Sequence, residues 1–163
     1  MDVPVARHLA VAVALGTAGC GPTPQPIDVV EITIGQIQAA IREGRTTCRM
    51  VVQTYLDRIE AYDESTVNAI TVVNPNALGR ADEIDVAVLS GEELGPLFCA
   101  PMLVKDNFDT HDLPTTGGSI ALVGSLPPDD AFMVRRIREA DAIVIAKTNG
   151  RVGVQPKADR QQL

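Results

Sequence analysis

The chain has 163 residues, of which 45% are hydrophobic and 21% charged, and its formal net charge is −7. This composition is typical of a soluble globular domain and excludes an intrinsically disordered chain. The acidic balance disfavours a nucleic-acid partner, because binding to phosphates requires a basic surface. The three cysteines and two histidines lack the spacing of a zinc site, so neither a metal nor a cofactor is expected.

Residues 1–20 predict an export signal. Arg7 and His8 precede the apolar residues 9–15, a run too short to span a bilayer, because a spanning helix needs roughly 20 apolar residues. Small residues follow this run, as they do in signal peptides. We therefore expect an extracytoplasmic protein, periplasmic or membrane-anchored. An ordinary cleaved signal or a mispredicted start codon is the alternative, and the latter would make the protein cytoplasmic.

Residues 17–20 are similar to a bacterial lipoprotein box, which makes Cys20 a candidate for lipidation and for a lipid anchor to a membrane. Thr17 stands where leucine is usual, and Asp2 weakens the positive start of the signal. Residues 21–27 contain three prolines and predict an extended linker, so the folded part is expected to cover residues 28–149.

Two helices are predicted at the start of the folded part. Thr33 can cap the first helix, which Gly44 would end. Thr46 or Thr47 can cap the second helix. Its apolar residues at helical spacing are Met50, Val51, Tyr55, Leu56 and Ile59.

The rest of the chain alternates between strands and helices. Residues 67–73 are rich in β-branched side chains and predict a strand, and residues 76–89 predict a helix with an apolar stripe. Residues 101–104 form a short apolar run, and residues 110–128 have the composition of a loop. This alternation predicts an α/β fold with helices packed on a mixed β-sheet.

The last two predicted elements are a helix over residues 131–140 and a strand over residues 142–146. Phe132, Val134 and Ile137 would face inward, with the arginines of the helix largely solvated. A continuously apolar strand is usually buried on both faces. Residues 102–105 and 143–147 are therefore expected to be neighbouring strands of one sheet, with the helix packed on it as a βαβ unit.

Several single residues allow two interpretations. If Cys20 is lipidated, Cys48 and Cys99 remain and could pair in an oxidising compartment, although nothing in the sequence requires it. Cys99 is interpreted as a small buried residue and not as a nucleophile. The acids and His111 in residues 106–112 could suggest a metal site or a His–Asp pair, but such loop acids are usually solvated turn formers. They are assigned no function.

Three blocks of sequence resemble the amidase signature family. Residues 95–107 read GPLFCAPMLVKDN, residues 115–119 read TTGGS, and residues 146–149 read AKTN. The blocks occur in the family's order and at its usual spacing, over roughly residues 28–149. The chain is therefore identified as the N-terminal part of an amidase-signature fold, which the sequence leaves incomplete. Cys99 replaces a glycine that is common at this position of the first block.

The resemblance implies amide hydrolysis by a Ser–Ser–Lys triad, with Lys105 as its base. A serine hydroxyl is a weak nucleophile until a base accepts its proton, and burial lowers the pKa of a lysine from about 10.4 toward neutrality. Lys105 follows an apolar run, where a buried lysine could lie. The simpler alternative is an ion pair with Asp106 or another acid. The spacing alone favours that alternative, and the resemblance reverses the preference.

The bridging and nucleophilic serines of the family lie after the position of Asn149, where this chain has none. Ser119 is interpreted as a residue that stabilises a supporting loop. Residues 150–163 are polar and unlike the family, as a frameshift, a premature stop or a truncated gene model would produce. The sequence predicts part of an amidase for small amide substrates that is itself inactive. The alternative is a non-catalytic remnant or binding module.

Overall fold

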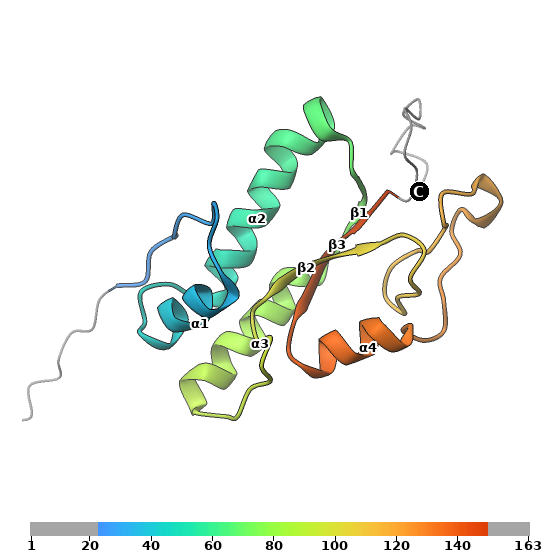
Figure 1. Ribbon diagram of the computed structural model, residues 1–163. Helices are drawn as coiled ribbons and strands as arrows, with labels where there is room; N and C mark the ends of the chain where they lie inside the picture. The colour runs from blue at the N-terminus through green and yellow to red at the C-terminus, as the bar shows by residue number, and fades with distance from the viewer. Residues whose placement is uncertain (1–22, 150–163) are drawn as a thin grey trace, which may run out of the picture.

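The computed structural model describes residues 23–149. These residues form an α/β domain with a three-stranded mixed sheet in the order β1-β3-β2 (Figure 1). The helices are α1 (Ile34–Arg42), α2 (Cys48–Tyr62), α3 (Ala77–Ser90) and α4 (Phe132–Glu139), with a π-turn η1 (Asp63–Val67) and a 3₁₀ turn η2 (Ile120–Leu122). The strands are β1 (Ile70–Val73), β2 (Pro101–Lys105) and β3 (Ile143–Thr148).

The first two helices begin at the predicted caps. The side chain of Thr33 accepts a hydrogen bond from the backbone N–H of Gln36, and the Gln36 side chain accepts one from the backbone N–H of Thr33, which closes a capping box at α1. Gly44 follows α1 with a left-handed backbone (φ 70°), the conformation for which glycine is favoured. Thr47 caps α2, and Val51 is fully buried on the inner face of that helix.

The first strand is shorter than the sequence predicts. Val67 belongs to η1, and β1 starts only at Ile70. The reason lies in the buried carboxylate of Asp63, which accepts the backbone N–H groups of Ala69 and Ile70. These bonds hold the chain in a tight turn through Asn68, whose φ of 50° is left-handed.

The βαβ unit predicted from the sequence is confirmed. Strand β2 pairs with β3 in parallel, while β1 pairs with β3 antiparallel. Helix α4 packs on the sheet through Val134, which contacts Val104 and Val144. Strand β3 is buried from Ile143 to Lys147, because it lies in the centre of the sheet with helices on both faces.

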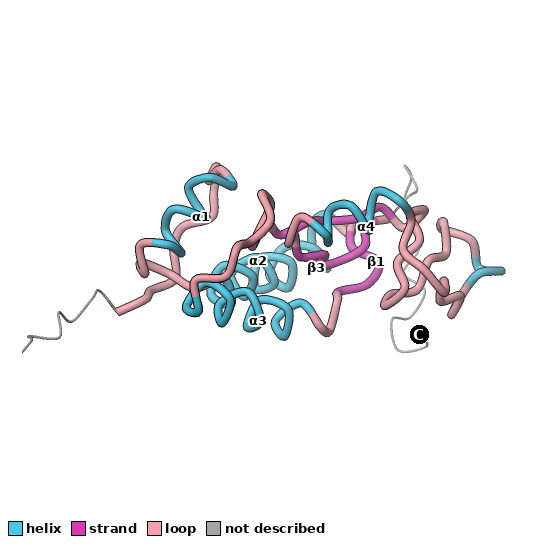
Figure 2. The backbone as a smooth tube through the Cα atoms, turned by 90° about the horizontal axis from the view of Figure 1, so that it is seen from below, coloured by secondary structure: helices cyan, strands magenta, loops and turns pink. Residues whose placement is uncertain are grey.

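The sheet separates two apolar clusters. On one face Ile143 and Ile145 pack against α1, α2 and α3, and on the other face Val144 packs against α4. Figure 2 shows α4 on one side of the strands and α2 and α3 on the other. The larger cluster therefore lies under α2 and α3.

A bulge in β3 changes which side chains face α4. Met102 pairs with Val144 and Leu103 pairs with Ala146, so Ile145 is an extra residue in β3. Beyond the bulge Val104 pairs with Lys147, which places the lysine on the face that β3 turns toward α4 and its preceding loop.

Two predictions for α4 were wrong. Phe132 was expected to face inward, but it is 66% exposed at the first turn of the helix. Arg138 was expected to be solvated, but it pairs with Asp112 and Asp130 in the loop that precedes α4. The helix is rotated so that Val134 faces the sheet, and this rotation carries Phe132 outward and Arg138 toward the loop.

Cys48 and Cys99, whose pairing the sequence left open, form a disulfide with a Cα–Cα distance of 5.6 Å. Both residues are fully buried, as was expected for Cys99. Cys99 has a left-handed backbone (φ 57°), a conformation that glycine adopts at little cost. The disulfide joins the start of α2 to the segment that precedes β2.

The predicted export signal, Cys20 and the polar tail 150–163 lie outside the described residues. Within residues 23–149, Gln25 donates its backbone N–H to Arg45, and Ile27 packs against the larger cluster. None of the helices described in this span is long and apolar enough to cross a membrane.

Candidate functional site

Lys105 is the last residue of β2, at the end of the sheet where the parallel strands β2 and β3 both finish. Its side chain is exposed, so the expected burial of this lysine is not observed. The physical reason is topological. Strand β2 lies at an edge of the sheet, and side chains alternate along it, so Lys105 points away from the face on which Val104 is buried.

The segment before β2 is held by backbone contacts with the end of α4. Gly95 donates its N–H to the carboxylate of Asp141 at 2.6 Å, and Leu97 donates to the carbonyl of Ala140 at 2.9 Å. A Cβ atom on Gly95 would lie 2.5 Å from the carbonyl carbon of Ala140. The glycine that opens the first motif is therefore required for this close approach.

The same segment is anchored on its other side by α1 and α2. The amide of Gln38 donates to the carbonyls of Pro96 and Phe98, at 3.0 and 3.2 Å. The disulfide between Cys48 and Cys99 adds a covalent link to α2. Together these contacts fix the entry into β2, and thereby the position of Lys105 at its far end.

A second lysine, Lys147, is fully buried one strand away. Its ammonium donates to the carbonyl of Phe108 at 2.9 Å, to Oγ1 of Thr110 at 3.2 Å and to Oγ1 of Thr115 at 2.5 Å. The carboxylate of Asp106 lies 3.6 Å from the ammonium. We call Asp106, Thr110, Thr115 and Lys147 the Lys147 cluster.

Burial lowers the pKa of Lys147, because an ammonium loses solvation inside the domain. The negative charge and hydrogen bonding of Asp106 oppose this effect, and the more distant Asp109 and Asp112 add to that opposition. The three hydrogen bonds use all three donors of the ammonium. This arrangement satisfies a buried cation that would otherwise be costly.

Asp106 corrects the interpretation of the loop acids as solvated residues. It is buried, its Oδ1 accepts the backbone N–H of Thr116 at 3.1 Å, and its Oδ2 accepts the hydroxyl of Thr116. Its own N–H donates to the carbonyl of Thr148 at the end of β3. The acid that follows Lys105 is thus paired with Lys147 and Thr116.

The other loop acids are also paired. The backbone N–H and ring of His111 both contact Asp130, and a nitrogen of Arg138 lies 2.6 Å from Asp112. Nε of Arg138 lies 3.1 Å from Asp130 without the angle of a hydrogen bond, so that contact is one between charges. Burial alone would raise the pKa of Asp130. The hydrogen bonds from His111 and the charges of Arg138 and His111 outweigh burial and lower it.

His111, Asp112 and Asp130 place potential ligand atoms within 4.8 Å of one another. Carboxylate and imidazole groups can hold a divalent metal. Here Arg138 pairs with both carboxylates, which supplies the positive charge that a metal would bring. The arrangement works as an ion-pair network that fastens the loop to α4.

The loop over residues 115–125 carries Ser119 and Ser125, and both side chains are exposed. The backbone of Ser119 bonds with Thr116 and Leu122, and the backbone carbonyl of Ser125 accepts from Thr115. Gly117 donates its N–H to the carbonyl of Asp106, which joins this loop to the residue after Lys105.

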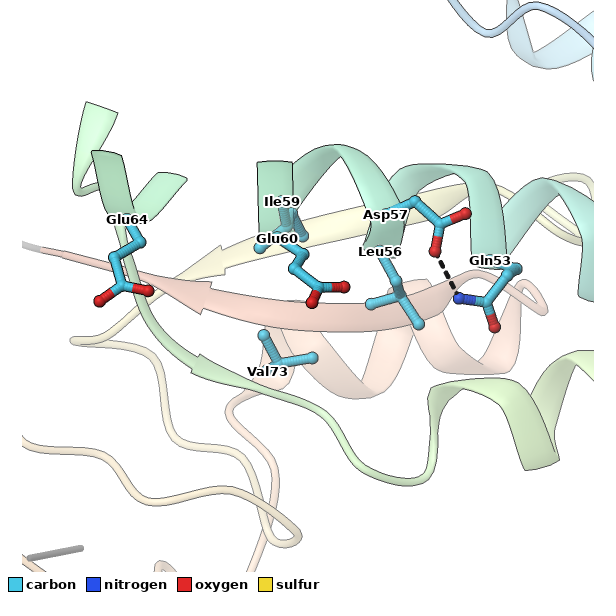
Figure 3. Close-up of a pocket in the computed structure, with 7 residues that line it drawn as sticks. All are labelled: Gln53, Leu56, Asp57, Ile59, Glu60, Glu64 and Val73. Carbon is cyan, nitrogen blue, oxygen red and sulfur yellow. Dashed lines mark hydrogen bonds between the residues drawn. The ribbon is translucent and has the colours of Figure 1, made fainter. Parts of the chain in front are cut away.

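A shallow groove of about 330 Å³ lies elsewhere, between α2, η1 and β1 (Figure 3). Its lining residues are Gln53, Leu56, Asp57, Ile59, Glu60, Glu64 and Val73. Lys105 does not line it, because β1 and β2 occupy opposite edges of the sheet. The groove is therefore separate from the candidate site.

The sequence-based interpretation missed Lys147, although it used the block AKTN. The signal was available, since a lysine at the end of the apolar residues 142–146 must be buried with the strand or lie at its exit. Its partners could not be identified, because Thr110 and Thr115 approach it only through the folding of a long loop.

Comparison with known proteins identifies relatives. The family model described as Amidase matches residues 50–152. A glutamyl-tRNA(Gln) amidotransferase of Streptomyces coelicolor, in the subunit that matches, is 39% identical over 122 residues, which cover 75% of this chain and 24% of the relative.

Two solved structures are similar in fold and in sequence. The native peptide amidase from Stenotrophomonas maltophilia has a TM-score of 0.69 and 39% identity, covering 73% of this chain and 25% of that one. An amidase family protein from Bacillus anthracis has a TM-score of 0.69 and 32% identity, covering 74% and 24%. The chain spans about a quarter of the length of these relatives.

Proposed function

The chain belongs to the amidase signature family, and we propose that it contributes Lys105 as the proton acceptor of an amide-hydrolysing site. Membership of the family supports amide hydrolysis in the full-length relatives. The observation that carries the proposal for this chain is the position of Lys105. Its amine is exposed at the carboxyl end of a parallel pair of strands, where ligands of open α/β sheets usually bind.

Two neighbouring elements support this position. The loop that reads TTGGS is joined to Asp106 by hydrogen bonds from Thr116 and Gly117. The block AKTN ends beside Lys105, where Thr148 pairs with it across the strands. All three motifs that resemble the family therefore meet at one end of the sheet.

The proposed chemistry is nucleophilic catalysis by a serine. The neutral amine of Lys105 accepts a proton through a bridging serine, and the nucleophilic serine attacks the amide carbonyl. The C–N bond breaks, the leaving amine takes up the proton, and water then hydrolyses the acyl-serine to release the acid. Backbone N–H groups would stabilise the oxyanion in both steps. Ser119 and Ser125 are not proposed for either serine role.

The proposed substrates are small amides. A role on tRNA, which the name of the Streptomyces coelicolor relative carries, is not favoured here, because the predicted export signal would separate the protein from tRNA. Residues 1–20 carry that predicted signal, and its cleavage near Cys20 remains part of the proposal. The mass of the mature protein would test it.

A graft tests the role of Lys105 directly. Residues 28–149 would replace the matching segment of the peptide amidase from Stenotrophomonas maltophilia, to which this chain is 39% identical. We expect the chimera to release ammonia from peptide amides. Lys105→Ala should lower kcat by at least about a thousandfold, as loss of a triad member does. Lys105→Arg should be equally impaired, because arginine stays charged.

The matched control is Arg135→Ala, which removes an exposed cation of α4 and should leave turnover within twofold. A chimera that retains full activity after Lys105→Ala would exclude Lys105 as the base. The same result in both Lys105→Ala and Lys105→Arg would point to a nucleophile activated from another part of the chimera.

A further inference from the structure

The two lysines and Asp106 are distributed over the two faces of the sheet. Val104 pairs with Lys147, and Lys105 pairs with Thr148. Because side chains alternate along β2, the residues on either side of Lys105 share the face toward Lys147, and Lys105 does not. The carboxylate of Asp106 accordingly lies 3.6 Å from the ammonium of Lys147, and both side chains are almost fully buried, at 2% and 0% exposure.

Lys147 is fixed in this position by its hydrogen bonds. Its three donors reach Phe108, Thr110 and Thr115, so the ammonium has no donor left with which to turn away. The carboxylate is fixed as well, since Thr116 donates to it from both its backbone and its hydroxyl. The pair therefore keeps one geometry within the Lys147 cluster.

We propose that Lys147 is a positioning residue that neutralises Asp106 and so leaves the amine of Lys105 free to act as a base. What Lys105 does rests on the proposed function; the arrangement of charges does not. A carboxylate close to an amine favours the protonated form of that amine. Without Lys147, the acid that directly follows Lys105 would hold the base in its inactive, charged form.

The inference distinguishes this role from simple packing. A lysine that only filled space could be replaced by any residue of similar size without affecting Lys105. A lysine that compensates Asp106 is required for as long as Asp106 is charged, and it becomes dispensable when Asp106 is replaced by asparagine. The two residues should therefore act as a coupled pair.

Competitive acylation of lysines in the full 163-residue chain provides the test. Acetic anhydride in trace amounts at pH 8 modifies only neutral amines, and mass spectrometry compares Lys105 with Lys157, an internal reference in the same chain. Lys147→Gln removes the cation but keeps a donor for the loop. We expect the relative acylation of Lys105 to fall about tenfold in this variant.

The double variant Lys147→Gln with Asp106→Asn should restore the relative acylation of Lys105 to within about threefold of the wild type. The matched control, Arg135→Gln, removes an exposed cation and should leave it unchanged. Unchanged acylation in folded Lys147→Gln, or no recovery in the double variant, would overturn the proposal. Circular dichroism shows whether each variant is folded.

Asp106→Asn alone keeps the test decisive if Lys147→Gln does not fold. Because Lys147 already compensates the carboxylate, this change should alter the acylation of Lys105 by less than about threefold. A tenfold rise would show that Asp106 acts on Lys105 in the native chain, and it would overturn the proposal. The labelling needs no amide turnover, so an inactive graft chimera would contradict only the proposed function.

Discussion

Backbone packing sets strict requirements at single residues of the segment that leads to Lys105. Gly95 lies against the backbone of Ala140, and no side chain can move aside to make room there. Gly79, in the middle of α3, has nothing within 4 Å of its missing Cβ. The two glycines therefore have opposite significance, although they look alike in the sequence.

Gly95→Ala should destabilise the domain by about 1–3 kcal/mol, because overpacking forces the backbone apart. Gly79→Ala should stabilise it by up to about 1 kcal/mol, through the higher helix propensity of alanine. Urea unfolding followed by circular dichroism measures both variants. Equal effects of the two changes would show that the contact between Gly95 and Ala140 does not constrain the chain.

Asp130 should make stability depend on acid pH. Its pKa in the folded domain is lowered below the ordinary 3.8, so the folded state binds its proton less readily than the unfolded state. The stabilisation is complete above about pH 3.8 and is lost as the pH falls through the lower folded value. Unfolding of the wild type and of Asp130→Asn should be compared between pH 2 and pH 6. The variant should be less stable at pH 6, and the difference should shrink toward pH 2.

Among the elements, α2 is held at its start by two separate devices. The carboxylate of Asp85, on α3, accepts the backbone N–H groups of Cys48 and Arg49 at 2.6 and 3.0 Å. A carboxylate at a helix N-terminus satisfies free donors and complements the helix dipole. The disulfide from Cys48 then ties the same end of α2 to the segment before β2.

Reduction of this disulfide should lower the free energy of unfolding by about 2–4 kcal/mol, because the bond closes a long loop in the unfolded chain. The cysteines are 51 residues apart in sequence. Thermal unfolding with and without dithiothreitol measures the effect. The double variant Cys48→Ala with Cys99→Ala should melt at the same temperature in both conditions. A peptide map in which both thiols are alkylated without reduction would show that the bond does not form.

At the scale of the molecule, residues 23–149 carry the three family motifs and bring them to one end of a sheet. Ser119 and Ser125 are the only serines that follow Lys105 in the 163 residues, and both lie in the exposed loop before α4. The Ser–Ser–Lys chemistry therefore has its base in this chain and no serine after Asn149 to serve it.

The purified 163-residue chain should show no amide turnover above background, because a triad that lacks two members retains no nucleophile. Ammonia release from a panel of aliphatic and aromatic amides measures this. Turnover that Lys105→Ala abolishes would contradict the prediction and would indicate Ser119 as the nucleophile. Turnover that Lys105→Ala does not change would come from a contaminant or from a different mechanism.

The sequence by itself determined the elements and their neighbours. Helical spacing and caps gave α1 to α3, because Thr33, Thr47 and Gly91 act on their own helix ends. The apolar run before Lys105 and the one ending at Ala146 predicted the parallel pair, since a helix between two strands favours a βαβ unit. These features follow from local chemistry that acts within a few residues.

Only the tertiary structure decided which charged groups are buried and what they contact. The bulge at Ile145 turns Lys147 toward the loop, and the loop then supplies Thr110 and Thr115 from more than thirty residues away. The edge position of β2 leaves Lys105 exposed, against expectation. Pairing between distant residues depends on the register of strands and the path of loops, which no local pattern specifies.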